Sequence, residues 1–132
     1  MKYPIYKPKI YPNTKKYVED CLETTWISSK GSYIKKFEKS FADFLDIKYA
    51  STVSNGTTSL HMCLCALGIK KGDEVIVPSF TYIASVNAIK YVGAKPIFVD
   101  SDKTTWNLDV TLIESLITKK TKAVMAVHLY GN

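Results

Sequence analysis

The residue types best suited to chemistry gather in one short polar turn, Ser54-Asn55-Gly56-Thr57-Thr58-Ser59. Five of these six residues carry a hydrogen-bonding side chain, and Gly56 allows the backbone to approach a ligand closely. A helical pattern follows, so the turn supplies helix-start amides that have no partner inside the helix. Because a helix start also carries roughly half a positive charge, the turn predicts an anion site suited to a phosphate group.

The turn by itself leaves a second interpretation open. It matches neither the GxxxxGK[ST] pattern nor the GxGxxG pattern of known phosphate-binding loops. Asn55 or Thr57 could simply cap the helix by accepting its first amide hydrogens. The residues alone therefore support a plain helix cap as well as they support a phosphate cradle.

A second group of reactive side chains, His61, Cys63 and Cys65, is close in sequence but does not predict a metal site. On a helix, positions two apart point about 200° away from each other. Packing of small side chains is therefore favoured over zinc ligation, and no metal is expected. With Cys21, the chain has three cysteines, and this odd number without framework spacing indicates free thiols in a reducing compartment.

The composition is that of a globular protein, with 46% hydrophobic and 23% charged residues among 132. This length fits one domain or one part of a larger domain. The net charge is +6, yet all 18 basic residues are lysine and they are spread along the chain. Base recognition relies on the arginine fork, so a nucleic-acid partner is not expected.

The amino-terminal segment MKYPIYKPKIYP lacks the apolar stretch of a signal peptide. No apolar run approaches the roughly 20 residues that a membrane span requires. We therefore expect a soluble, cytoplasmic protein without a membrane partner.

The sequence around the turn alternates patterns typical of short apolar strands with patterns typical of amphipathic helices. The strands show no polar alternation, as expected when both sheet faces are covered. This order predicts an α/β fold with a mostly parallel sheet and helices on both faces, and ligands at the carboxyl ends of the strands. We expect strands at 50–53, 74–77, 96–99 and 123–127, and helices at 14–24 (capped by Asn13 or Thr14), 33–45, 58–67 (stopped by Gly68), 82–91 and 109–117 (capped by Asp109).

The run VSNGTTSLHMCLCALGIKKGDEVIVPSFTYIASVNAIKYVGAKPIFVDSD, residues 53–102, closely resembles the DegT/DnrJ/EryC1/StrS family. These are sugar-nucleotide aminotransferases of the fold-type-I class that depends on pyridoxal 5'-phosphate. The resemblance extends back to WISSKGSYIKKFEKSFADFL and forward to TKKTKAVMAVHLYGN, in order. Within the family, NGTTSL, TYIASVNAI and VDSD…TWNLD are most similar to the perosamine synthase type.

The resemblance assigns cofactor contacts to two places in the chain. It implies that the turn of Gly56, Thr57 and Thr58 holds the phosphate of pyridoxal phosphate. It also implies that the ring of Tyr82 lies over the pyridine ring, where offset stacking can hold it. Without the resemblance, Tyr82 would be interpreted as a partly buried packing residue.

Three further residues receive a role on the substrate side. The loop that contains Trp26 and Ser28 is similar to the family's substrate-side loop, which often lies near a neighbouring subunit's site. His128, in the HLYG turn, is a candidate neighbour of cofactor or substrate. The alternatives are a core anchor for Trp26 and a purely structural histidine.

The resemblance also implies what residues 1–132 do not include. The aspartate that pairs with the pyridine nitrogen and the Schiff-base lysine both come later in the family, so no catalytic residue is assigned in this chain. We expect amino-terminal helices and the substrate-side loop at 1–48, and an incomplete cofactor-binding large domain at 49–132. Residues 1–132 alone are not expected to be active.

For the complete protein, the resemblance implies transfer of an amino group from glutamate to a nucleotide-linked 4-keto-6-deoxyhexose. The product would be an amino sugar for glycan biosynthesis, and the enzyme would be a homodimer. Two alternatives stay open: a non-catalytic truncated or split-gene remnant, and a deoxysugar dehydratase of the same family. The sequence leaves the identity of the sugar and nucleotide open.

Overall fold

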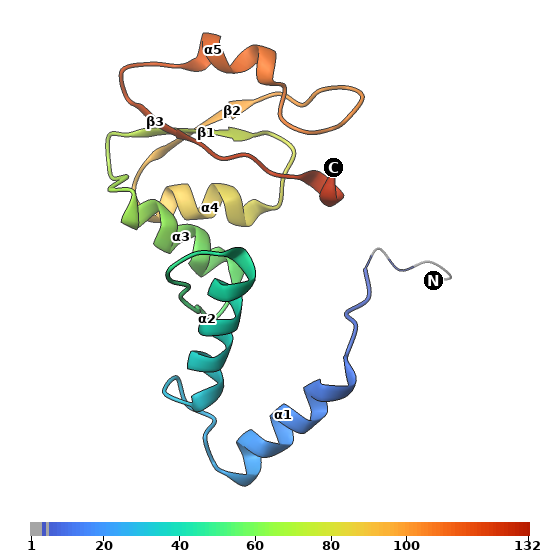
Figure 1. Ribbon diagram of the computed structural model, residues 1–132. Helices are drawn as coiled ribbons and strands as arrows, with labels where there is room; N and C mark the ends of the chain where they lie inside the picture. Colours follow the sequence, from blue (N-terminus) through green and yellow to red (C-terminus); the bar gives the residue numbers. More distant parts are fainter. Residues whose placement is uncertain (1–3, 5) are drawn as a thin grey trace. The chain divides into compact units, whose positions relative to one another are not determined.

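The computed structural model describes Pro4 and residues 6–132. The chain forms two compact units, one ending at Thr52 and the other beginning at Val53. Figure 1 shows the helices of the first unit in blue to teal and the sheet-containing unit in green to red. Each unit is described by itself. Among the helices of Pro4 and residues 6–132, none is long and apolar enough to cross a membrane.

The first unit contains α1 (Pro12–Glu23) and α2 (Ser32–Leu45). Neither Asn13 nor Thr14 caps α1, so that prediction is wrong: both residues already lie inside the helix, after Tyr11 as the N-cap. The cause is Pro12, whose fixed φ suits the first helical position and whose missing N–H costs nothing there. The helix therefore begins before the polar residues that were expected to start it.

α2 carries an apolar stripe at helical spacing, but this stripe is not buried within the first unit. Phe37, Phe41 and Phe44 are 58%, 44% and 81% exposed. The rings of Phe37 and Phe41 stack on each other with centroids 5.6 Å apart. Ala42 is the one buried residue of the helix, so packing inside this unit uses only a small part of the stripe.

The predicted strand at 50–53 is wrong, because these residues form no regular structure. The Glu38 carboxylate accepts a hydrogen bond from the Thr52 amide at 2.8 Å and another from the Thr52 hydroxyl at 2.9 Å. A side chain of α2 thus takes an amide hydrogen that a strand ladder could otherwise use.

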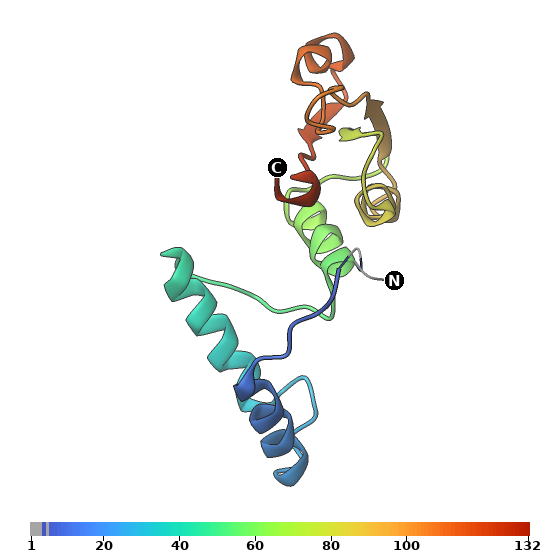
Figure 2. The ribbon, with the colours of Figure 1, turned by 90° about the vertical axis from the view of Figure 1, so that its right-hand side faces the viewer.

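The second unit confirms the α/β prediction, with a parallel three-stranded sheet in the order β2-β1-β3. Figures 1 and 2 show α3 and α4 on one side of this sheet and α5 on the other. In chain order its elements are α3 (Gly56–Ala66), β1 (Glu74–Pro78), α4 (Ile83–Tyr91), β2 (Lys95–Val99), a 3-10 turn η1 (Val110–Leu112), α5 (Ile113–Leu116), β3 (Thr121–Val124) and a second 3-10 turn η2 (Leu129–Gly131).

The core of this unit is built around β1, whose five residues are all buried. Val75 and Val77 pack with Leu64 of α3 and Ile89 of α4. Ile76 points to the opposite face, since side chains alternate along a strand, and it is fully buried as well. Complete burial of each such side chain stabilises the fold by about 1.5–3 kcal/mol, so β1 fixes the sheet and its two flanking strands.

The remaining predicted elements agree in type but not always in extent. Asp109 caps the following segment as expected, accepting from the Thr111 amide at 2.9 Å. That segment is a 3-10 turn followed by the four-residue α5 rather than one continuous helix. Gly68, with φ of +73°, follows α3 as the expected stop, because a left-handed conformation there suits glycine.

The Glu38–Thr52 contact makes a pH-dependent contribution to the stability of the first unit. Hydrogen bonds from the Thr52 amide, and then from its hydroxyl, lower the pKa of Glu38 below its ordinary value of 4.5. A lowered folded-state pKa stabilises the fold above pH 4.5, and that contribution is lost as the pH falls through the lowered pKa. We expect Glu38→Gln to reduce the acid-dependent loss of stability.

The measurement is urea unfolding of both proteins between about pH 3 and 7, with carboxyl NMR titration of Glu38. Glu23→Gln, on exposed α1, is the control and is expected to leave the pH profile unchanged. Equal acid sensitivity in the Glu38→Gln variant and in the unsubstituted chain would contradict this account.

Candidate functional site

One edge of the second unit gathers most of the residues to which the sequence assigns chemistry. The three strands are parallel, so their carboxyl ends lie together, and Figure 1 shows the first turns of α3 and α4 at that same edge. Gly56 begins α3, Tyr82 precedes α4 and His128 follows β3. Ligands of open parallel sheets bind at this edge, so the topology places these residues where a site is expected.

The start of α3 is capped by Asn55, as one of the two interpretations of the turn predicted. Its Oδ1 accepts from the Thr58 amide at 2.9 Å and from the Thr58 hydroxyl at 3.2 Å. The Asn55 carbonyl accepts from the Ser59 amide at 3.1 Å. Asn55 is therefore the cap, and Thr57 is not.

The cap leaves part of the helix start free for an anion. Among the described residues, the amides of Gly56 and Thr57 have no acceptor. A Cβ placed on Gly56 would meet nothing within 4 Å. No part of the chain beyond the glycine's neighbours and its own helix therefore crowds the backbone at Gly56, and the two amides and the helix dipole favour a negative group at this helix start.

The hydroxyl of Thr58 is already engaged inside the turn. It lies 3.2 Å from Asn55 Oδ1 and 3.4 Å from Ser54 Oγ. To donate to an anion, this hydroxyl would have to turn away from Asn55. The two backbone amides are therefore the better prepared donors, and the Thr58 side chain first of all secures the cap.

Tyr82 is the N-cap residue of α4, and its carbonyl accepts from the Ser85 amide at 3.1 Å. Its side chain is 79% exposed, so the ring is not part of the core of this unit. The neighbouring Thr81 and Ser85 hydroxyls lie 3.2 Å apart. The backbone of Tyr82 is thus fixed by the helix start, while its ring is free to stack on a flat ligand.

The three substrate-side candidates fall in different units. His128 is exposed, and its Nδ1 lies 3.1 Å from the Asn132 carbonyl oxygen. Trp26 and Ser28 belong to the first unit, where Trp26 is 57% exposed. The Ser28 hydroxyl oxygen accepts from the Lys30 amide at 3.1 Å, so it stabilises its own loop.

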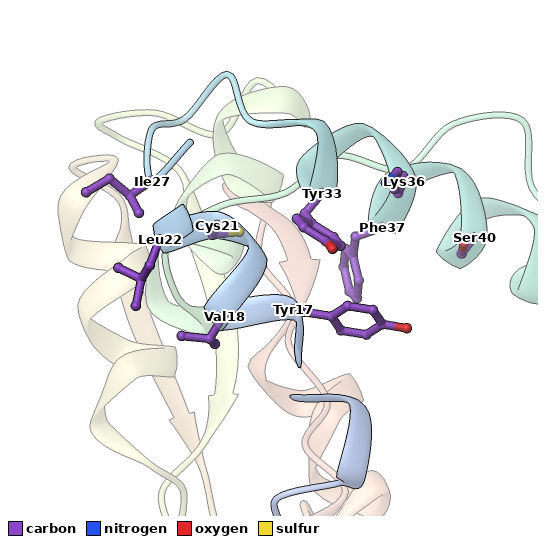
Figure 3. A pocket seen from close by; sticks show the side chains of 9 residues that line it. All are labelled: Tyr17, Val18, Cys21, Leu22, Ile27, Tyr33, Lys36, Phe37 and Ser40. Carbon is purple, nitrogen blue, oxygen red and sulfur yellow. The ribbon is translucent and has the colours of Figure 1, made fainter. Parts of the chain in front are cut away.

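The first unit also has a groove of about 780 Å³ between α1 and α2. Figure 3 shows the rings of Tyr17, Tyr33 and Phe37 close to one another in it, and the two tyrosine rings are 5.2 Å apart. Burial, and then a hydrogen bond to Asp20, raise the pKa of Tyr33. The lining is mainly apolar with one charged residue, Lys36, which offers packing surface rather than a chemical site.

The sequence reasoning missed a pocket of about 490 Å³ in the second unit. Its aromatic residues are Phe80, Trp106 and Tyr130. The sequence contained an indication of this pocket, because each of the three aromatic residues lies in a segment that follows a different strand of the sheet. No group of three or more histidine, cysteine or acidic side chains that could hold a metal occurs within Pro4 and residues 6–132.

Comparison with known proteins gives a consistent result. A model of the DegT/DnrJ/EryC1/StrS aminotransferase family matches residues 8–132. The GDP-perosamine synthase of Escherichia coli O157:H7 is 63% identical over 133 residues, covering 100% of this chain and 36% of that protein. A putative sugar aminotransferase of Streptococcus pneumoniae in its PMP-form superposes with a TM-score of 0.89 at 35% identity, covering 98% of this chain and 32% of that chain.

A third relative is the E. coli GDP-4-keto-6-deoxy-D-mannose-3-dehydratase with bound hydrated PLP. It has a TM-score of 0.86 at 32% identity and covers 98% of this chain and 35% of that chain. The chain therefore spans about a third of the length of the proteins that it resembles.

The Asn55 cap yields a stability prediction that is independent of any ligand. Asn55→Ala removes the acceptor for the Thr58 amide and is expected to lower the free energy of unfolding by about 1 kcal/mol. Asn55→Asp keeps an acceptor at the same position and should retain most of the stability. Urea unfolding of the two variants measures the difference, and equal losses in both would show that the side-chain cap is not the stabilising contact.

Proposed function

This chain belongs to the DegT/DnrJ/EryC1/StrS aminotransferase family, and from that premise we propose that it supplies the cofactor-phosphate site of an enzyme that makes an amino sugar on a nucleotide carrier. The observation that carries the proposal is the 63% identity with a GDP-perosamine synthase over the whole chain. The open start of α3 supports it, since the turn presents free donors where a phosphate is expected.

Pyridoxal phosphate fits the residues at this edge. Its phosphate would accept from the amides of Gly56 and Thr57, which lack other acceptors among the described residues. The absence of a side chain at Gly56 leaves room for phosphate oxygens to approach the backbone. The exposed ring of Tyr82 would provide a flat apolar surface for the pyridine ring.

When bound, pyridoxal phosphate supplies the electron sink for moving an amino group between carbon atoms. The residues of this chain would fix its position rather than carry out the proton transfers. The two amides and the start of α3 would hold the phosphate by charge-assisted hydrogen bonds. The ring of Tyr82 would limit tilting of the pyridine ring and exclude water from it. Orientation of this kind is a principal protein contribution in cofactor enzymes.

We further propose glutamate as the amino donor, a nucleotide-linked 4-keto-6-deoxyhexose as the acceptor and a homodimer as the working form. The acceptor agrees with the names of two relatives, a GDP-perosamine synthase and a GDP-4-keto-6-deoxy-D-mannose-3-dehydratase. We also propose His128 of the second unit as a neighbour of the substrate, and the loop of Trp26 and Ser28 in the first unit as a substrate-side segment of this or a neighbouring subunit.

The test of the overall function replaces the matching segment of the E. coli O157:H7 GDP-perosamine synthase with residues 1–132 of this chain. The chimera is incubated with pyridoxal phosphate, glutamate and GDP-4-keto-6-deoxy-D-mannose, and the products are identified by mass spectrometry. An aminated sugar nucleotide is the expected product. A folded chimera that forms no aminated sugar nucleotide would contradict the proposal, because the synthase portion supplies the Schiff-base lysine and only the cofactor-phosphate site would come from this chain.

Gly56→Val in the chimera is expected to weaken binding of pyridoxal phosphate sharply. Beyond its chain neighbours and its own helix, a Cβ at position 56 would meet nothing within 4 Å, whereas a phosphate held close to the backbone there would meet the added side chain. The fold should therefore tolerate it while the phosphate cannot. Absorbance titration with the cofactor measures the affinity. Ala66→Val, at the other end of α3, is the matched control, and equal affinities in the two variants would contradict the cradle.

Tyr82→Ala is expected to weaken cofactor binding less than Gly56→Val does. Stacking on one aromatic ring contributes about 0.5–1.5 kcal/mol beyond its area burial. Several hydrogen bonds to a charged phosphate together contribute more. The same absorbance titration ranks the two variants, and a larger loss for Tyr82→Ala would reverse the proposed order of importance.

A further inference from the structure

One peptide bond of the polar turn, between Asn55 and Gly56, has a reactivity of its own. It is the one place in the sequence where glycine follows asparagine. At such a step the backbone nitrogen of the glycine can attack the side-chain amide carbon of the asparagine and close a succinimide ring. A side chain on the following residue would crowd that attack, and glycine has none. The sequence therefore identifies Asn55 as a candidate for spontaneous deamidation.

The structure leaves the attacking nitrogen accessible. Asn55 and Gly56 are both exposed, and the Gly56 amide has no acceptor among the described residues. Beyond its chain neighbours and its own helix, a Cβ at Gly56 would meet nothing within 4 Å. The nitrogen must lose its proton before it attacks, and the partial positive charge at the start of α3 favours the resulting anion. The Gly56 amide is thus free, reachable by water and electrostatically activated.

The other internal asparagines lack this combination. Asn13 is followed by Thr14, whose amide donates to a backbone carbonyl at 2.9 Å. Asn87 lies inside α4, where the following amide donates along the helix. The side chain of Asn107 is held at both ends, by hydrogen bonds of 2.9 Å and 3.1 Å. Asn55 alone among these four joins a following glycine to a free following amide.

The cap of α3 sets how often the reaction can begin. Asn55 Oδ1 accepts from the Thr58 amide at 2.9 Å and from the Thr58 hydroxyl at 3.2 Å. Its Nδ2 donates to Ser54 Oγ at 3.3 Å. To reach the Gly56 nitrogen, the side chain must leave these partners. Exposed helix ends open locally at a small cost in free energy, so the reaction can proceed slowly while the sheet stays folded.

Deamidation changes the charge of the turn. The Gly56 nitrogen forms a bond to Asn55 Cγ, the Cγ–Nδ2 bond breaks, and ammonia leaves with the proton of the Gly56 amide. Water then opens the succinimide at either carbonyl, which leaves aspartate or isoaspartate at position 55. Aspartate can still cap the helix, whereas isoaspartate lengthens the backbone at the cap. Either product brings a negative charge to the helix start that would otherwise attract an anion.

We propose that Asn55 is a site of spontaneous deamidation that closes the anion position at the start of α3, and that a phosphate bound there suppresses the reaction. One group links the two parts, because the Gly56 amide is both the attacking nitrogen and a donor to the phosphate. An amide that donates to a phosphate keeps its proton and does not attack. The suppression rests on the proposed function, which places the cofactor phosphate at this amide, whereas the deamidation itself does not.

The modification site is tested on residues 1–132 in mildly alkaline buffer, with circular dichroism to follow the fold. Peptide mapping by mass spectrometry and release of ammonia measure the reaction. Asn55 is expected to lose its amide before Asn13, Asn87 and Asn107 do, and both aspartate and isoaspartate should be recovered. Asn55→Ser keeps a capping oxygen without an amide, so most of the early ammonia release should be lost. Earlier conversion of another asparagine would overturn the proposal.

The suppression is tested on the chimera described above. With pyridoxal phosphate at about 100 times its Kd, the free fraction and with it the rate at Asn55 should fall about 100-fold. Pyridoxal at the same concentration, which has the aldehyde but no phosphate, is the control and should leave the rate nearly unchanged. Asn55→Asp should bind pyridoxal phosphate at least about fivefold more weakly than Asn55→Ser, since repulsion between two unit charges a few ångströms apart gives this factor even in bulk water.

Two results would contradict this coupling in a chimera that binds the cofactor by absorbance titration. Equal rates of deamidation with pyridoxal phosphate and with pyridoxal would overturn the suppression. Equal affinities of the Asn55→Asp and Asn55→Ser variants would overturn the closing of the anion position. Failure of the proposed function has a different result, because the chimera would then bind no pyridoxal phosphate while Asn55 still lost its amide at a rate that neither compound changed.

Discussion

Burial of β1 on both faces is the constraint from which the rest of the second unit follows. Helices cover the two faces of β1, and its backbone groups pair in the plane of the sheet with β2 and β3, which run in the same direction. Parallel strands need crossover connections, which here contain α4 on one side of the sheet and α5 on the other. One edge consequently receives every strand end and the first turns of α3 and α4. The site residues share a location because of this arrangement, although they are far apart in sequence.

The parts of this arrangement that the sequence predicted are those fixed by local chemistry. Asn55 and Asp109 cap their helical segments because short polar side chains reach the next amides. Gly68 suits the position after α3 because glycine tolerates the positive φ that this position requires. The parallel sheet was predictable because apolar strands without alternation require cover on both faces. The position of the polar turn at the sheet edge followed from the same reasoning.

Other features depended on contacts that no local pattern contains. Residues 50–53 have the composition of a strand, yet Glu38, fourteen residues earlier, takes the Thr52 amide. The apolar stripe of α2 has helical spacing, but the spacing does not specify what covers it, and Phe44 is 81% exposed. In the aromatic pocket, Asn107 bridges the loop of Trp106 to the segment of Tyr130, a contact between distant parts of the sequence. Roles for Gly56, Thr57, Thr58 and Tyr82 came from the family resemblance, and they are still predictions for this chain.

The strand order β2-β1-β3 also has a consequence for the time course of folding. β1 and β2 are separated only by α4, so their pairing closes a short loop, and the Leu64–Val77–Ile89 core can form with them. β3 joins β1 only after the longer segment with η1 and α5 has been ordered, and closing a longer loop costs more entropy. The α3–β1–α4–β2 segment is therefore suited to act as the nucleus. On a growing chain this segment also emerges from the ribosome before β3 does, so half of the edge formed by the strand ends can assemble while translation is still in progress.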